Sequence, residues 1–180
     1  MDYGIFRFKS FNVYPLSVLN GPYASCEFTN ISFAGKGQNL DTGLKIIHNA
    51  PHTTSVVDSK SISKDGGICT FRSNVLVKPN AKKSKLSISC ESLMLDSISR
   101  SDTIPVDTIL NDDVEFAHEA TVGKISDEAI YYLETRGMSE LEAKSLIVRG
   151  FAEPIAKAFP VEYAVEMNRL IELELEGTIG

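Results

Sequence analysis

The sequence has 180 residues, of which 43% are hydrophobic and 23% are charged, and its formal net charge is −6. This balance excludes a wholly disordered chain, and no apolar run approaches the roughly 18–20 residues that a membrane-spanning helix needs. Residues 1–90 carry 11 Lys and Arg against 5 Asp and Glu, and residues 91–180 carry 7 against 19. Neither half interleaves Arg with aromatic residues, so no nucleic-acid partner is expected.

Residues from about 12 to 119 are predicted to form short β-strands, because apolar and polar residues alternate there without helical spacing. The predicted strand centres, about 6 to 13 residues apart, are Phe33, Ile46, Val56, Cys69, Val75 and Ile88. Turn residues separate most of them, at 35–37, 49–51, 65–67 and 79–80. This pattern suits the rungs of a β-solenoid, but equally a sandwich or a jelly roll.

From Ser126 onward the pattern changes to helix. Ser126 is a suitable N-cap for a first helix, which Gly137 would stop. Ser139 and Glu142 form a capping box that opens a second helix, expected to end near Gly150.

A last helix is predicted over about 161–176, with Gly177 as its C-terminal stop. Pro154 and Pro160 are assigned to first turns, where proline is tolerated. The fold class expected from these patterns is mainly β, with an α-helical tail.

The three cysteines, Cys26, Cys69 and Cys90, are far apart and form no C-x-x-C pair. This spacing argues against a disulfide framework and against a closed structural zinc site. Residues 1–10 show no signal-peptide pattern, so a cytoplasmic location is expected, or an organelle stroma if the gene is organellar. Cys90 shares its strand parity with Leu86 and Ile88, so it is inert if that face is the core and reactive if the strand lies at an interface.

The segment 115–119 ends the β half, and in an extended chain Glu115, Ala117 and Glu119 point one way and Phe116 and His118 the other. His118 could be a hydrogen-bonded core histidine, or it could join a thiolate and a carboxylate as a loose ligand set for iron. A second histidine pair, His48 and His52, is not expected to bind metal, because Pro51 makes a helix there improbable.

Several stretches together resemble, in order and spacing, the C-terminal part of SufB within the SufB/SufD family. The stretches that carry this resemblance are 33–43, 45–48, 89–92, 101–105, 118–121, 136–139 and 150–154. The resemblance covers about residues 12–180. Relative to the family, the chain lacks the long region that precedes this part, including an upstream cysteine, and Ala117 stands where SufB proteins can have Glu.

The resemblance implies a right-handed parallel β-helix over 1–122 and a C-terminal helical domain over 123–180. It implies a non-catalytic scaffold for iron–sulfur cluster assembly, with a transient cluster and no permanently bound cofactor. The implied partners are a SufD-type or second SufB-type subunit through the β-helix, a SufC-type ATPase through about 126–160, and a sulfur donor protein. Neither nucleic acid nor a membrane is among them.

The resemblance assigns sulfur acceptance and cluster assembly to Cys90, with Glu119 and His118 as cluster-proximal ligands. Two other functions remain open on the sequence. One is a thiol enzyme in which Cys90 is the nucleophile and His118 the base. The other is a non-catalytic interaction module with Cys90 packed in its core.

Overall fold

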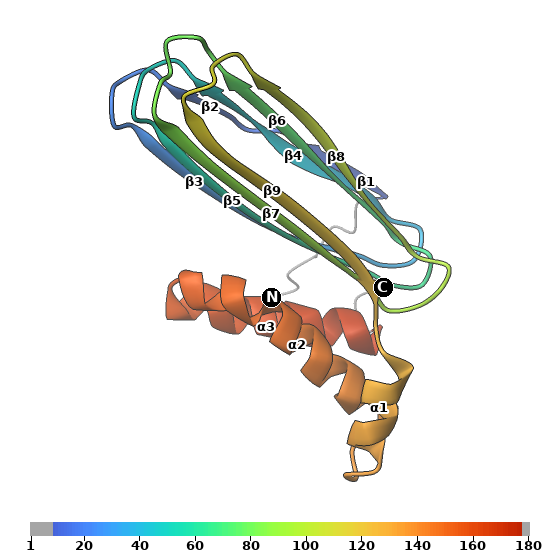
Figure 1. Ribbon diagram of the computed structural model, residues 1–180. Coiled ribbons are helices and arrows are strands. Elements are labelled where there is room, and N and C mark those ends of the chain that lie inside the picture. The colour runs from blue at the N-terminus through green and yellow to red at the C-terminus, as the bar shows by residue number, and fades with distance from the viewer. Residues whose placement is uncertain (1–8, 178–180) are drawn as a thin grey trace, which may run out of the picture.

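The computed structural model describes residues 9–177, which form a β-solenoid followed by three helices (Figure 1). Each turn of the solenoid contributes to two parallel sheets, and the strands make four turns. The strands are β1 (Ser10–Val13), β2 (Leu16–Leu19), β3 (Ser25–Ala34), β4 (Asn39–His48), β5 (Thr54–Ser63), β6 (Ile68–Val77), β7 (Ser84–Met94), β8 (Arg100–Ile109) and β9 (Val114–Lys124). The helices are α1 (Asp127–Glu134), α2 (Glu140–Ala158) and α3 (Val161–Glu176).

The first sheet has the order β1-β4-β6-β8, with β2 also paired to β4, and the second has the order β3-β5-β7-β9. Paired residues lie one whole turn apart in sequence. Asn39 pairs with Ile68 and Ser84 pairs with Val114, which are offsets of 29 and 30 residues. The strand spacing alone left a solenoid, a sandwich and a jelly roll open, and this pairing confirms the solenoid.

The space between the two sheets is filled by the inward side chains of both, as the alternation along each strand predicts. The core of this lumen consists of Leu19, Leu44, Ile46, Val57, Phe71, Val75, Val77, Ala81, Leu86, Ile88 and Cys90. Cys69 and Val75, treated above as two strand centres, belong to the single strand β6. Strands β8 and β9 end their sheets, so the last turn has a neighbouring turn on one side only within the described residues.

The helix caps follow the sequence closely. The Ser126 side chain accepts a hydrogen bond from the Ala129 N–H, and Ser139 and Glu142 form the predicted capping box. Helix α3 begins and ends as predicted, with Gly177 in the left-handed conformation at φ 69°.

The expected end of the second helix near Gly150 is wrong, because α2 continues to Ala158 with Pro154 inside it. Proline removes the hydrogen bond to the carbonyl four residues earlier, and its ring crowds that carbonyl. Here that carbonyl belongs to Gly150, which has no side chain to restrict local adjustment. Packing explains the rest, since Val148, Ala152 and Ile155 are all buried.

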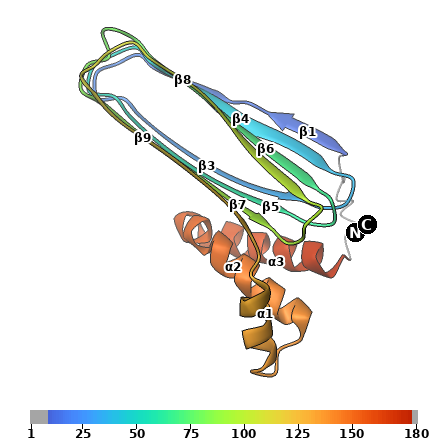
Figure 2. The ribbon, with the colours of Figure 1, turned by 45° about the vertical axis from the view of Figure 1, so that its right-hand side comes forward.

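Helices α2 and α3 lie along the outer face of the β3-β5-β7-β9 sheet (Figures 1 and 2). A row of apolar residues in register, Phe33, Ile62 and Leu93, meets the helices there. The buried helix residues in the same cluster are Ile130, Ala143, Val148, Ala152 and Ile171. No helix within residues 9–177 is long and apolar enough to cross a membrane.

Candidate functional site

Cys90 lies in the middle of β7, on the strand next to the end of its sheet, and its side chain points into the lumen. It shares this face with Leu86 and Ile88, as the strand parity predicts. The residue is only 2% exposed. A single further strand, β9, separates it from the end of the sheet.

His118 is the nearest polar side chain to the Cys90 thiol from that last strand. It pairs with Ile88, while Cys90 pairs with Ala120, so the histidine lies diagonally across from the cysteine on the same face. The distance from Cys90 Sγ to His118 Nε2 is 4.0 Å, the outer limit for a hydrogen bond to sulfur. The fold thus brings together two of the three predicted site residues.

The other ring nitrogen of His118 contacts a residue that the sequence analysis missed. His118 Nδ1 lies 2.8 Å from Oδ2 of Asp107, which comes from β8 in the opposite sheet. The Ser73 hydroxyl in turn donates to Oδ1 of Asp107 at 3.2 Å. Asp107 has the same strand parity as Thr103 and Pro105, but only the solenoid closure shows that it faces His118 across the lumen.

Glu119 is not brought to this pair. It is paired with Ser89 on the outer face of the sheet, opposite to the face that carries Cys90 and His118, and it is exposed. The alternation along β9 also puts Ala117 on the outer face. Any contact between Glu119 and the thiol would require either a local change in β9 or a bound species that reaches around its edge.

Burial raises the pKa of the Cys90 thiol to about 11, and the nearby carboxylates of Asp107 and Asp58 add to the effect. Both causes disfavour the thiolate, since a charge is costly in an apolar lumen and more so beside negative charge. The thiol is therefore protonated at neutral pH in this chain. Activated catalytic thiols have the opposite environment, with lowered pKa values.

A metal ion bound by both Cys90 and His118 would fix the distance between their donor atoms. For tetrahedral coordination, ordinary metal–sulfur and metal–nitrogen bond lengths place the two donor atoms about 3.5 Å apart. The observed 4.0 Å between Cys90 Sγ and His118 Nε2 is close enough for small side-chain adjustments to close. Within residues 9–177, however, no group of three or more His, Cys, Asp and Glu side chains could hold a metal ion. The two donors lie within reach of one shared metal ion, but they form an incomplete set.

His48 is a second buried histidine, and its ring is held by hydrogen bonds to hydroxyl groups. Its ring nitrogens lie 2.7 Å from the Thr53 hydroxyl and 3.0 Å from the Ser55 hydroxyl, and Thr53 also contacts Ser84. His52 instead stacks on Tyr23 with ring centroids 5.0 Å apart. The two histidines therefore have different partners.

Burial lowers the pKa of His48 to about 4, so the folded chain keeps this imidazole neutral. The unfolded chain takes up a proton at the ordinary pKa near 6.5, which makes unfolding more favourable as the pH falls from 6.5 toward 4. We expect up to about 3 kcal/mol of stability to be lost across this window. Urea unfolding of wild type and His48→Gln at several pH values tests this, and an equal slope in both chains would contradict it.

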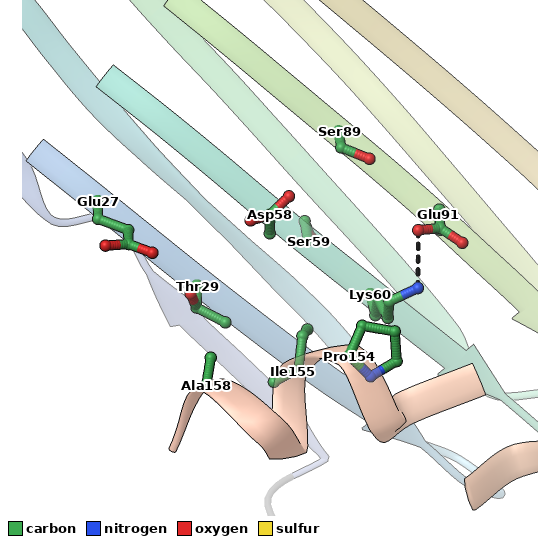
Figure 3. Close-up of a pocket in the computed structure, with 10 residues that line it drawn as sticks. All are labelled: Glu27, Thr29, Asp58, Ser59, Lys60, Ser89, Glu91, Pro154, Ile155 and Ala158. Carbon is green, nitrogen blue, oxygen red and sulfur yellow. Dashed lines mark hydrogen bonds and ion pairs between the residues drawn. The ribbon is translucent and has the colours of Figure 1, made fainter. Parts of the chain in front are cut away.

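A cavity of about 150 Å³ lies between α2 and the outer face of the second sheet (Figure 3). Lys60 reaches into it from β5 with its side chain 8% exposed, forms a 2.7 Å ion pair with Glu91, and lies 4.5 Å above the Phe151 ring. The remaining lining residues are Glu27, Thr29, Asp58, Ser59, Ser89, Pro154, Ile155 and Ala158. The lysine charge thus has a carboxylate partner within the sheet and an aromatic partner on α2, and we interpret these three residues as a latch that holds α2 on the sheet.

Removing the carboxylate of this latch is expected to leave a buried lysine charge without its partner. Glu91→Gln should therefore lower the free energy of unfolding by about 1–3 kcal/mol, as measured in urea. The matched control is Glu115→Gln, which breaks the exposed Lys85–Glu115 pair and should leave stability unchanged. Equal effects of the two substitutions would show that the latch adds nothing.

Comparison with known proteins gives one family. The family model for the SUF system FeS cluster assembly, SufBD core domain, matches residues 6–151. An iron–sulfur cluster assembly SufBD family protein of Staphylococcus saprophyticus is 52% identical over 93% of the chain and 36% of its own length. The iron–sulfur cluster assembly protein SufB of Bacillus subtilis is 50% identical over the same shares.

A SufBD family protein of Mycobacterium tuberculosis is 47% identical over 93% of the chain, which is 20% of that protein. The chain thus spans about a third of the Staphylococcus and Bacillus relatives and about a fifth of the mycobacterial one. With a β-solenoid, three C-terminal helices and the matched core domain, the chain belongs to the SufBD family of iron–sulfur cluster assembly proteins.

Proposed function

We propose that this chain is the C-terminal part of a SufB-type scaffold subunit, which holds a nascent iron–sulfur cluster as cargo and passes it to apo-proteins. The observation that carries the proposal is the pair of Cys90 Sγ and His118 Nε2, 4.0 Å apart and next to the end of the solenoid. The chain would be non-catalytic, and ATP hydrolysis would belong to a partner.

The chemistry of this donor pair suits temporary holding. Settled clusters usually have four cysteine thiolates, whereas this site offers one thiol and one imidazole. A cluster bound by two donors from this chain would need its remaining ligands from elsewhere and would leave readily once those were withdrawn. Glu119 remains a proposed third ligand. Its outward position means that it would act at the exposed border of β9 rather than inside the lumen.

The end of the solenoid supports a partner subunit at the same place. β8 and β9 are edge strands, and unpaired strand edges are open to pairing with another chain. Phe116 and Val122 continue the lumen face of β9, paired with Leu86 and Ser92, yet they are 38% and 50% exposed. We infer that a SufD-type or second SufB-type subunit covers this end and completes the ligand set.

The helical layer supports a second partner. Leu141 and Leu146 are exposed on α2, beside a groove that Arg149 and Glu172 also line. We propose that residues of about 126–160 bind a SufC-type ATPase.

A sulfur donor protein would deliver sulfur to the Cys90 thiol from the side of the partner interface. A cytoplasmic or organellar setting is proposed for these steps.

The thiol-enzyme alternative has one observation in its favour, since Cys90, His118 and Asp107 are arranged in the order of a nucleophile, a base and an orienting acid. The environment of the sulfur is against it. Cys90 is 2% exposed and its pKa is raised to about 11, the reverse of an activated nucleophile. The scaffold is therefore the better-supported function.

A graft into a longer relative tests the proposal. Residues 9–177 would replace the corresponding third of B. subtilis SufB in cells that depend on that protein. We expect the activity of cluster-dependent enzymes to be restored to near its original level. A grafted protein that accumulates in folded form without restoring this activity would contradict the proposed function.

A further inference from the structure

We propose that Asp107 is a positioning residue for the cluster site. Its carboxylate holds His118 in the tautomer that presents the free electron pair of Nε2 to the Cys90 sulfur and to any metal bound there. The claim about metal binding rests on the proposed function, whereas the claim about the His118 tautomer concerns this chain alone. The residues involved come from four strands around the last two turns of the solenoid.

The first step is the hydrogen bond between His118 Nδ1 and Asp107 Oδ2, at 2.8 Å. An ionised carboxylate can only accept hydrogen bonds, so the proton must lie on Nδ1 of the imidazole. In a neutral ring the other nitrogen, Nε2, then carries the electron pair. Nε2 is the atom that lies 4.0 Å from Cys90 Sγ.

The second step is that Asp107 is itself held in place. The Ser73 hydroxyl of β6 donates to Oδ1 of Asp107 at 3.2 Å, which leaves Oδ2 directed at the histidine. The Asp107 and His118 side chains are each only 12% exposed, so water competes weakly for either group. Phe116 packs edge-on against the His118 ring, with centroids 6.3 Å apart. The ring is thus confined from two directions.

The third step is the chemistry of the arrangement. Histidines that bind metals generally donate their other ring N–H to a carboxylate or a carbonyl, which fixes the tautomer and strengthens the ligand. Losing such a partner typically lowers metal affinity by about 10–100-fold. Asp107 cannot bind the same ion as Cys90, because it lies on the far side of the imidazole. Its role is therefore to orient His118, not to act as a ligand.

Asp107→Asn is the sharpest test, because it keeps the shape of the side chain. Ser73 should retain the amide oxygen as its acceptor, which turns the amide NH₂ toward His118 Nδ1. An NH₂ donor there requires an unprotonated Nδ1, so the proton should move to Nε2. Nitrogen-15 NMR of the metal-free 180-residue chain at about pH 8, above the ordinary histidine pKa, reads the tautomer directly. Asp102→Asn, a half-buried position on the opposite face of the same strand, is the matched control.

Wild type and Asp102→Asn are expected to carry the proton on Nδ1 of His118, and Asp107→Asn on Nε2. An unchanged tautomer in Asp107→Asn would overturn the proposal. Cobalt(II) titration of the same chains, followed by thiolate-to-cobalt absorbance, should show about 10–100-fold weaker binding for Asp107→Asn only.

A reversed tautomer with undiminished cobalt affinity would overturn the claim that the orientation serves metal binding. The failure of the proposed function looks different. In that case cobalt would bind wild type and Cys90→Ser equally, while the NMR result would still decide whether Asp107 sets the tautomer.

Discussion

Replacing Cys90 with serine is expected to abolish cluster assembly by the grafted scaffold, with at least about a tenfold loss of cluster-dependent enzyme activity. Serine keeps the size of the side chain but removes the soft sulfur donor that lies beside His118. Fold stability should change little, because the residue stays small and buried. The readout is the activity of a cluster-dependent enzyme in cells that carry the graft.

The other two cysteines are matched controls for this change. Cys69 is buried and its thiol donates to the Ile62 carbonyl, and Cys26 donates to the Ser17 hydroxyl. A serine hydroxyl can make both hydrogen bonds, so Cys69→Ser and Cys26→Ser should be tolerated. Equal loss of activity from all three substitutions would remove the special role of Cys90.

Placing two carboxylates on the exposed apolar surface of α2 is expected to prevent binding of the ATPase partner. Leu141 and Leu146 are 44% and 48% exposed, and their replacement by Asp puts charge where an interface would have to exclude water. An interface that buried these positions would have to desolvate both new charges, so binding should fall by at least about tenfold. A pull-down with a SufC-type ATPase measures this.

Helix α3 provides the control for the ATPase experiment. Tyr163 and Val165 are also exposed but lie outside residues 126–160, so Tyr163→Asp and Val165→Asp should leave binding intact. Cys90→Ser should leave it intact as well, because the thiol lies on the opposite face of the sheet from the helices. If the α3 variants lose binding and the α2 variants do not, the proposed contact is on the wrong helix.

The strands and helix caps could be predicted because they depend on local rules. The predicted strand centres fall in β3, β4, β5, β6 and β7, and the Ser139–Glu142 capping box fixed the start of α2. The solenoid itself could not be derived this way, since the spacing of short strands suits a sandwich or a jelly roll equally well. Only the family resemblance distinguished it from a sandwich.

The errors came from tertiary effects. Gly150 and Pro154 are both signals that a helix ends, but the burial of Val148, Ala152 and Ile155 carries α2 through them. The pairing of Cys90 and His118 needed the register of β7 and β9, which no local pattern provides.

Asp107 was missed for a related reason. It is 11 residues from His118 and belongs to the opposite sheet. No pattern in the neighbouring sequence indicates that this polar side chain faces the lumen. Glu119 illustrates the reverse case. The family resemblance assigned it to the same site as His118, whereas strand alternation puts the two side chains on opposite faces.

Anaerobic reconstitution tests most directly whether the end of the solenoid holds a cluster at a subunit interface. The 180-residue chain would be mixed with a SufD-type subunit, iron(II) and sulfide, and its visible absorbance and iron content measured. Sulfur-to-iron charge-transfer bands should appear in the mixture and be lost with either Cys90→Ser or His118→Ala. Undiminished bands and iron content in both variants would contradict the account, because the cluster would then be held by other residues.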